Sequence, residues 1–229
     1  MEQKEGEEDK FLDIARKYNI DLRKLELEQL KLAKNLEIKD KIDFSLTERI
    51  AGIENIFVRN RIISAIIVIN NDFEVLEQEY FEDKVKFPYI PGFRAYRELP
   101  NMVSVFNKID EKPDVIFVRG HGIMHPRGLG IASHFSLAIS VPVIGIADSL
   151  LLGEIKGDNI FLNDKLVGKV VKTKEKARSL YVSPGNLISV SSAENLVKKF
   201  IREGHRIPEP LRLAKRYAKE IMKELFKQI

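Results

Sequence analysis

Hydrophobic residues in the first forty positions recur at a spacing typical of amphipathic helices. A series of leucines is spread among Lys and Glu within residues 11–39. This near-helical spacing places the apolar side chains on one face of a helix. Residues 19–21 interrupt the pattern, and Asp21 is a residue type that caps the start of a helix. We therefore predict a helical segment at residues 1–40 that packs on the rest of the chain and carries no function of its own.

The pattern changes near residue 50 to short apolar runs that are typical of β-strands. Three such runs are rich in Ile, Val, Phe and Tyr, and turn sequences at residues 59–61 and 70–72 separate them. Consecutive strands joined by tight turns predict an antiparallel meander. The three predicted strands cover residues 50–57, 62–69 and 73–81.

Helices alternate with short apolar strands farther along the chain. This alternation predicts parallel strands that are buried on both faces, followed by a second hairpin and two closing helices. The predicted fold class is α/β: a mixed sheet with three antiparallel strands and then two parallel ones, flanked by helices, in one domain (1–229). The helices are predicted at residues 94–108, 130–138, 193–202 and 209–227, and the strands at 115–118, 143–146, 159–163 and 165–171.

Composition narrows the class of protein further. The 229 residues are 44% hydrophobic and 31% charged, which is typical of one well-packed globular domain. The chain has no cysteine, and this excludes disulfides, thiolate metal sites and thiol nucleophiles. No apolar run approaches the roughly 18–20 residues that cross a bilayer. Residues 1–10 are too charged for a signal peptide, so we expect a cytoplasmic protein without a membrane segment.

Charge is distributed unevenly along the chain. The net charge is +4, but residues 165–229 contain 16 Lys and Arg against 6 Asp and Glu. A basic region of this kind fits a surface that faces phosphates. A solvated helix face fits the same asymmetry, so both interpretations stay open on charge alone.

A glycine-rich loop follows the predicted strand at residues 115–118. Residues 119–130, RGHGIMHPRGLG, contain four glycines, two histidines and two arginines. Ligands of open α/β sheets gather at the carboxyl ends of parallel strands. Glycines allow close backbone approach and leave amides free, and Arg and His can donate to phosphates or base edges. We therefore predict a ligand site at this loop.

Three further segments contain prolines at informative positions. In residues 87–92, FPYIPG, two prolines stiffen the chain and would present Tyr89 and Ile90 as a rigid tip that can enter a base stack. A turn that covers a core edge is the alternative, and composition alone favours it. Residues 181–186 are predicted to form a turn, and the prolines of residues 206–212 to start a helix whose amides can receive an anion.

Together these segments resemble the endonuclease V family. The resemblance covers residues 49–219 and rests on FPYIPG, RELP, PDVIFVRGHGIMHPRGLGIASH, PVIGIADSLL, YVSPGNL and RIPEPLRLA, in family order. It implies a ribonuclease H-like fold. It also implies recognition of deaminated nucleotides, chiefly hypoxanthine (inosine), in DNA or RNA. The expected partner is therefore such a nucleic acid, bound by a monomer away from any membrane.

The resemblance also implies which residues bind the nucleic acid. In the family the PYIP segment is the wedge beside the extruded base, and the glycine-rich loop lines the base and strand pocket. The corresponding base-binding positions are Pro88, Tyr89, Ile90, Pro91, Gly92, Gly120, His121, Gly122, His125 and Arg127.

The catalytic positions depart from the family pattern. Family members hydrolyse a phosphodiester with a divalent metal held by carboxylates, assisted by a lysine and a histidine. The first metal aspartate is Glu54 here, and the glutamate of R-E-x-P is kept as Glu98. The aspartate before G-x-G is replaced by Arg119. Asp148 stands in place of the lysine, and Lys215 in place of the histidine.

These departures put metal-dependent cleavage in doubt. Mg²⁺ prefers oxygen ligands, and Arg119 would remove one ligand and add a cation beside the metal. An acid and a base have also exchanged places, so Arg119 and Asp148 are expected to form an ion pair between adjacent strand ends. The Arg119 guanidinium would then bind Glu54, Glu98 and Asp148, or a substrate phosphate.

Our leading hypothesis is therefore base recognition with an impaired nuclease site and no metal assigned. Mg²⁺ would be a cofactor only if the family's nuclease activity survives. Three alternatives remain open. The first is metal-independent, glycosylase-type chemistry on the flipped base by the acid–base set around Arg119 and His121. The second is a slow Mg²⁺-dependent endonuclease, and the third is a structural subunit with a vestigial nucleic-acid surface.

Overall fold

The three antiparallel strands predicted near residue 50 form one end of a nine-stranded sheet. The computed structural model describes residues 2–174 and 177–226. Strand β1 (Ile50–Val58) pairs antiparallel with β2 (Arg61–Ile69), which pairs antiparallel with β3 (Val75–Lys84). The predicted meander is confirmed, although its third strand begins two residues later than expected.

The two parallel strands lie beside β1, as predicted. Strand β4 (Val115–Arg119) pairs parallel with β1, and β5 (Val143–Ala147) pairs parallel with β4. The carboxyl ends of β4 and β5 therefore meet at one edge of the sheet. The predicted α/β class, with antiparallel strands followed by parallel ones, is confirmed.

The prediction of a turn at residues 181–186 is wrong. These residues belong to strand β9 (Leu180–Asn186), which pairs antiparallel with β5. Proline and glycine in this segment favour a turn, but Pro184 lies where β9 pairs with β5 alone and next to an irregularity in register at Val143. Such positions tolerate proline in a sheet. Beyond β9 the sheet continues through β8 (Lys165–Val171), β7 (Asn159–Leu162) and β6 (Glu154–Lys156).

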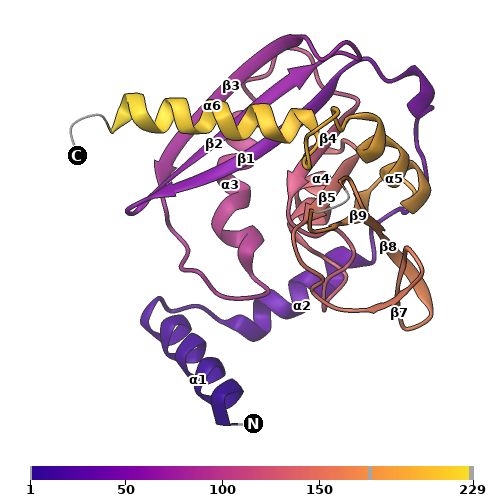
Figure 1. The fold of residues 1–229 in the computed structure, drawn as a ribbon. Helices are drawn as coiled ribbons and strands as arrows, with labels where there is room; N and C mark the ends of the chain where they lie inside the picture. Colours follow the sequence, from indigo (N-terminus) through magenta and orange to yellow (C-terminus); the bar gives the residue numbers. More distant parts are fainter. Residues whose placement is uncertain (1, 175–176, 227–229) are drawn as a thin grey trace.

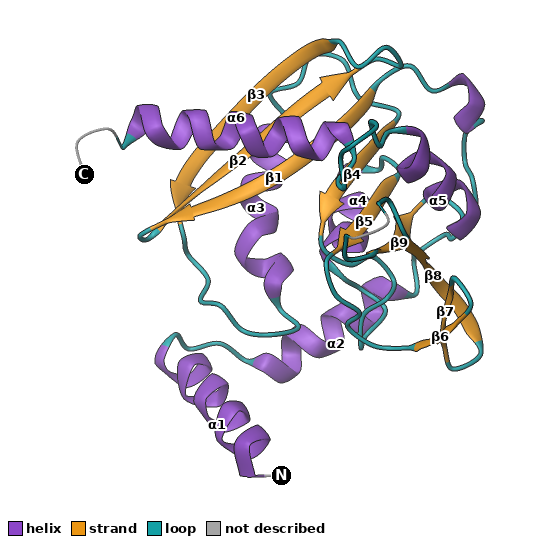
Figure 2. Cartoon of the chain, in the orientation of Figure 1, coloured by secondary structure: helices purple, strands orange, loops and turns teal. Residues whose placement is uncertain are grey.

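Helices cover both faces of the sheet (Figure 2). One apolar core lies between the sheet and helices α3 and α4, and a second lies on the opposite face under α5 and α6. The alternation of β4 divides its side chains between them, with Ile116 in the first core and Phe117 in the second. The helices are α3 (Arg94–Phe106), α4 (Ile131–Ile139), α5 (Val190–Lys199) and α6 (Glu209–Leu225).

The start of α6 passes directly over β1. A Cβ atom built on Gly52 would lie 2.2 Å from the carbonyl carbon of Pro210, so only glycine fits this crossing. The contact brings the Pro-Glu-Pro segment at the start of α6 onto the strand that carries Glu54.

The N-terminal segment forms two helices at one end of the molecule (Figure 1). Helix α1 (Glu2–Lys17) begins earlier than predicted, and α2 (Leu22–Ala33) ends earlier. Asn19, with φ of 53°, separates them, and the Asp21 side chain accepts a hydrogen bond from the Lys24 amide at 2.9 Å, as expected for an N-cap. A short 3-10 helix, η1 (Phe44–Leu46), follows.

Across residues 2–174 and 177–226, no helix combines the length and the apolar character needed to cross a membrane.

Candidate functional site

The predicted catalytic positions converge at the edge where β4 and β5 end. Glu54 lies on β1, Arg119 is the last residue of β4, and Asp148 directly follows β5. Glu98 reaches this edge from α3 and Lys215 from α6, and the charges of both act on the Glu54 carboxyl. The structure therefore brings together all five positions that the sequence comparison placed in one site.

Arg119 and Asp148 form the ion pair that the exchange of charges predicts. The other carboxylate oxygen of Asp148 accepts a hydrogen bond from Arg206 Nη1 at 2.6 Å. Arg206 also donates to the carbonyls of Arg178 and Ser179, at 2.7 and 3.2 Å. Asp148 thus bridges two guanidinium groups and ties the segment before α6 to the end of β5.

Glu98 is bound by Arg94, not by Arg119 as expected. Its side chain is 3% exposed and accepts bonds from Arg94 Nε at 2.6 Å and Arg94 Nη2 at 2.9 Å. Asn55 Nδ2 adds a third bond at 2.7 Å. The sequence did not lead us to expect Arg94 or Asn55 as a partner of Glu98. The four-residue spacing of Arg94 and Glu98 on one helix was a signal that could have indicated the first of these contacts.

Glu54 is the least compensated carboxyl of the site. Burial raises its pKa from 4.5 to about 7, and the nearby charges of Arg119, Lys215 and Arg94 oppose this rise only in part. Within the described part of the chain, Glu54 Oε2 and Arg119 Nη1 are buried and have no hydrogen-bond partner. The expected direct bond between Arg119 and Glu54 is therefore not formed, although their charges interact.

Cations outnumber carboxylates around this edge. The cations are Arg94, Arg119, Arg206 and Lys215, and the carboxylates are Glu54, Glu98 and Asp148. Nowhere in residues 10–174 and 177–226 do three or more His, Cys, Asp or Glu side chains lie in an arrangement that could hold a metal ion.

A cavity of about 460 Å³ lies beside this edge, between residues 89–95 and the glycine-rich loop. Its size is in the range of small-molecule sites. Arg94 lines it together with apolar residues that include Leu129, Ile131 and Leu151. The predicted base-binding residues that line it are Tyr89, Pro91, Gly92, His121, His125 and Arg127.

The rigid tip consists of Tyr89 without Ile90. The Tyr89 side chain is 58% exposed, whereas Ile90 is 3% exposed and packs against Ala15 of α1. The prediction that Ile90 forms part of the exposed tip is wrong, because successive side chains of an extended segment point to opposite sides. Pro88 is half-buried and Pro91 is exposed.

The first two loop glycines serve packing. The Gly120 amide donates to the Ile146 carbonyl at 3.0 Å, and the Gly122 amide donates to Ser183 Oγ at 2.7 Å. A Cβ on Gly122 would lie 2.0 Å from the Pro184 carbonyl oxygen. The expectation that these amides stay free for a ligand is wrong, because β5 binds the Gly120 amide and β9, which the sequence did not reveal, binds the Gly122 amide.

Both loop histidines are neutral at neutral pH. Burial lowers the pKa of His125 to about 4, and it also lowers the pKa of His121. His121 Nε2 lies 3.0 Å from the Ser149 carbonyl oxygen. Neutral imidazoles can still donate and accept hydrogen bonds, so these residues can contact a base but add no positive charge.

The start of α6 holds a buried acid. Glu209 is 1% exposed and receives two bonds of 2.6 Å from Arg212, and the pKa of this carboxyl is lowered mainly by that contact. The sequence predicted that the first turn of α6 could bind an external anion. The protein's own Glu209 carboxylate lies in that turn. Arg206 and Arg212 are engaged in ion pairs within the protein, whereas Lys215 is exposed.

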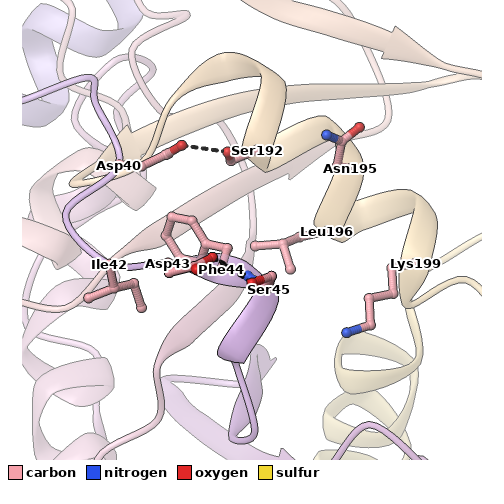
Figure 3. Close-up of a pocket in the computed structure, with 9 residues that line it drawn as sticks. All are labelled: Asp40, Ile42, Asp43, Phe44, Ser45, Ser192, Asn195, Leu196 and Lys199. Atoms are coloured by element: carbon pink, nitrogen blue, oxygen red, sulfur yellow. Dashed lines mark hydrogen bonds between the residues drawn. The ribbon is translucent and has the colours of Figure 1, made fainter.

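A second cavity, of about 420 Å³, lies between residues 40–45 and α5 (Figure 3). None of the predicted site residues lines it. Asp40 points toward Ser192 and accepts its hydroxyl at 2.7 Å, and it also accepts the Ser189 amide at 2.7 Å. Asp40 therefore holds Ser189, the N-cap residue of α5, in place, which is a structural role.

Comparison with known proteins identifies relatives over most of the chain. A family model described as endonuclease V matches residues 30–216. Endonuclease V of Thermosipho melanesiensis is 35% identical over 188 residues, which cover 79% of this chain and 83% of the relative. Endonuclease V of Dictyoglomus thermophilum is 36% identical over 199 residues, which cover 81% and 87%.

Solved structures confirm the ribonuclease H-like fold. The Bacillus subtilis endonuclease V superposes with a TM-score of 0.84 at 24% identity and covers 91% of this chain and 95% of its own. The catalytic domain of human endonuclease V has a TM-score of 0.82 at 25% identity, with 91% and 98% covered. A Ciona intestinalis endonuclease V, solved with a 24mer DNA containing an inosine followed by a ribo-adenosine, has a TM-score of 0.81 at 20% identity, with 89% and 98% covered.

Proposed function

The chain belongs to the endonuclease V family, and on that premise we propose that it binds DNA or RNA containing deaminated nucleotides, chiefly inosine. We further propose that phosphodiester cleavage by the family's metal-dependent route is impaired. The two parts rest on different regions of the molecule. Recognition rests on the cavity beside Tyr89, and the loss of cleavage rests on the ion-paired edge beyond β4 and β5.

Support for base recognition comes from the shape and chemistry of the cavity. Its volume of about 460 Å³ is sufficient for one flipped base, and its lining combines apolar side chains and imidazoles with the guanidinium groups of Arg94 and Arg127. The exposed Tyr89 ring stands at its mouth on a segment stiffened by two prolines. An aromatic group in this position can fill the gap that an extruded base leaves in the stack.

The single observation that carries the second part is the Arg119–Asp148 ion pair. Divalent metal catalysis needs several oxygen ligands around the ion. Here Asp148 is neutralised by two arginines, Glu98 by Arg94, and Glu54 has a pKa of about 7. This donor set does not fit Mg²⁺, because each carboxylate is either paired with a cation or partly protonated at neutral pH.

Binding and cleavage are tested separately with matched oligonucleotides. DNA and RNA strands with one inosine, and otherwise identical strands with guanosine, are titrated with protein in EDTA, and fluorescence anisotropy reports binding. We expect preferential binding to inosine that persists in EDTA and weakens with added salt. The same substrates are then incubated with Mg²⁺ or Mn²⁺. Nicking at the rate of the Thermosipho melanesiensis relative, assayed in parallel, would refute the proposed impairment, and equal binding to guanosine strands would refute recognition.

One observation favours a second candidate function. A carboxyl with a pKa of about 7, such as Glu54, is poised to donate a proton near neutral pH. Such an acid could give its proton to a flipped base as the glycosidic bond breaks and the base leaves with the bonding electrons. The oxygen of a water molecule then bonds to the sugar carbon, and the proton that this water loses returns to the Glu54 carboxylate. Mass spectrometry of the reaction products discriminates between the candidates, since free hypoxanthine arises only from this chemistry.

A further inference from the structure

We infer that Gln29 and Arg127 are positioning residues: together they join the N-terminal helices to the Tyr89 tip and set how strictly the cavity selects inosine. This inference rests on the proposed recognition function. The residues involved come from three separate regions of the chain, namely α2, the segment after the tip, and the glycine-rich loop. We call their meeting point the tip junction, defined by Glu26, Gln29, Gly92, Phe93 and Arg127.

Gln29 gives the junction its most unusual feature. Helix α2 buries this glutamine at 1% exposure while its leucines Leu27 and Leu30 are 60% and 47% exposed. A buried amide is stable only when its polar atoms are hydrogen-bonded. Gln29 Nε2 donates to the Gly92 carbonyl at 3.1 Å, and Gln29 Oε1 accepts from Arg127 Nε. The residue that α2 buries therefore forms polar contacts with two segments that are distant in sequence, at Gly92 and Arg127.

Arg127 completes the junction from the glycine-rich loop. Its Nη2 donates to the Gly92 carbonyl at 2.8 Å, and its guanidinium lies over the Phe93 ring with 4.5 Å to the centroid. Its Nη1 lies 3.3 Å from the Glu26 carboxylate. The guanidinium is thus directed at other parts of the protein, and its side chain is only 16% exposed.

An apolar layer supports the same junction. Ile90 and Phe93 pack with Ala15 of α1 in one cluster, which also includes the partly buried Phe87. Tyr89 therefore stands between two anchored neighbours, Phe87 and Ile90. Because its neighbours are anchored on both sides, the backbone of Tyr89 is held in place before any ligand arrives.

The junction also borders the cavity, which links tip position to selectivity. Gln29, Gly92 and Arg127 all line the cavity, so loosening their bonds changes its width as well as the mobility of the tip. A binding site that is held rigid discriminates better between similar ligands than one that adapts to each. The family match begins at residue 30, so Glu26, Gln29 and all of α1 lie outside the matched region.

The test combines two junction variants with one matched control on the same helix. Gln29→Leu removes both amide bonds at similar volume, and Arg127→Lys keeps the charge but loses the planar group that bonds three partners. Leu27→Gln changes an exposed position of α2 outside the junction. Hydrogen exchange of residues 87–93 in the free protein reports whether the tip is held. The affinity ratio of inosine to guanosine strands and the fluorescence of 2-aminopurine next to the inosine report selectivity and insertion of the tip.

We expect exchange of residues 87–93 to accelerate about tenfold or more in both junction variants, with β1 unchanged. We expect the preference for inosine to fall about tenfold and the 2-aminopurine signal to drop. Leu27→Gln should match the wild type in every measurement. If Gln29→Leu does not fold, Gln29→Glu replaces it, because it keeps the acceptor for Arg127 and loses the donor to Gly92.

Each contrary outcome has a distinct meaning. Unchanged exchange in folded junction variants overturns the inference that the junction holds the tip. Faster exchange with unchanged inosine preference overturns its role in selectivity. If the wild-type protein shows no preference for inosine, the proposed function fails and the selectivity role fails with it. In that case the exchange data still decide whether the junction holds the tip.

Discussion

Replacing the Glu54 carboxyl with an amide tests the electrostatics of the site directly. In the folded protein burial raises the pKa of Glu54 to about 7, while the ordinary value of 4.5 applies to the unfolded chain. The folded state therefore favours the protonated carboxyl. The stability that Glu54 contributes is fully present below pH 4.5 and is lost as the pH rises through 7. Glu54→Gln keeps the neutral form at every pH and should escape this loss.

The two pKa values set the size of the effect. Each pKa unit corresponds to about 1.4 kcal/mol, so the full difference is about 3 kcal/mol, and most of it is expected between pH 5 and pH 8. The free energy of unfolding of Glu54→Gln, relative to the wild type, should therefore rise by that amount over this range. Any steric cost of the amide is the same at both pH values and cancels.

Urea denaturation of both proteins in EDTA, at pH 5 and pH 8, measures this difference. The Leu27→Gln variant serves as a control, since an exposed neutral position should show no pH-dependent difference from the wild type. A difference between Glu54→Gln and the wild type that stays the same at both pH values would show that Glu54 ionises normally. The argument that this carboxyl is a poor metal ligand at neutral pH would then fail.

Three more changes test the site and its supports. Arg119→Asp combined with Asp148→Lys restores the family's charges, and we expect Mn²⁺ to raise the melting temperature of this variant but not of the wild type; equal responses would contradict the ion-pair argument. Gly52→Ala should lower the free energy of unfolding by about 2 kcal/mol in urea, because its Cβ would meet Pro210 at 2.2 Å. Lys215→Ala should reduce the slope of log affinity against log salt by about one for inosine DNA if this exposed lysine contacts a phosphate; an unchanged slope would remove Lys215 from the interface.

Local pattern was sufficient to predict much of the fold. The meander of β1, β2 and β3 follows from apolar runs and turn residues that are neighbours in the chain. The Arg119–Asp148 pair could also be predicted, because both residues end strands that lie side by side in a parallel sheet. For the meander, the deciding information lies in neighbouring residues. For the ion pair, it lies in the regular arrangement of two adjacent parallel strands.

Other parts of the site depended on contacts between distant segments. Strand β9 was hidden by Pro184 and Gly185, whose turn preference is overridden because β5 pairs with this end of the strand and β8 with its other end. Ile90 was assigned to the exposed tip because its partners on α1 and α2 are about 70 residues away in the chain. The bonds that Arg127 forms within the protein could not be predicted for the same reason, since its partner Gln29 is far away in sequence.

The sequence by itself determined the order of most strands and helices, the family, and which charges stand at the catalytic positions. Only the tertiary structure decided the remaining pairings: Glu98 is paired with Arg94, and Asp148 binds Arg206 in addition to Arg119. The physical reason is that periodicity and charge belong to the chain, whereas burial and hydrogen-bond partners arise when distant segments pack together. Packing also gives Glu54 its raised pKa, because desolvation depends on every element that covers it.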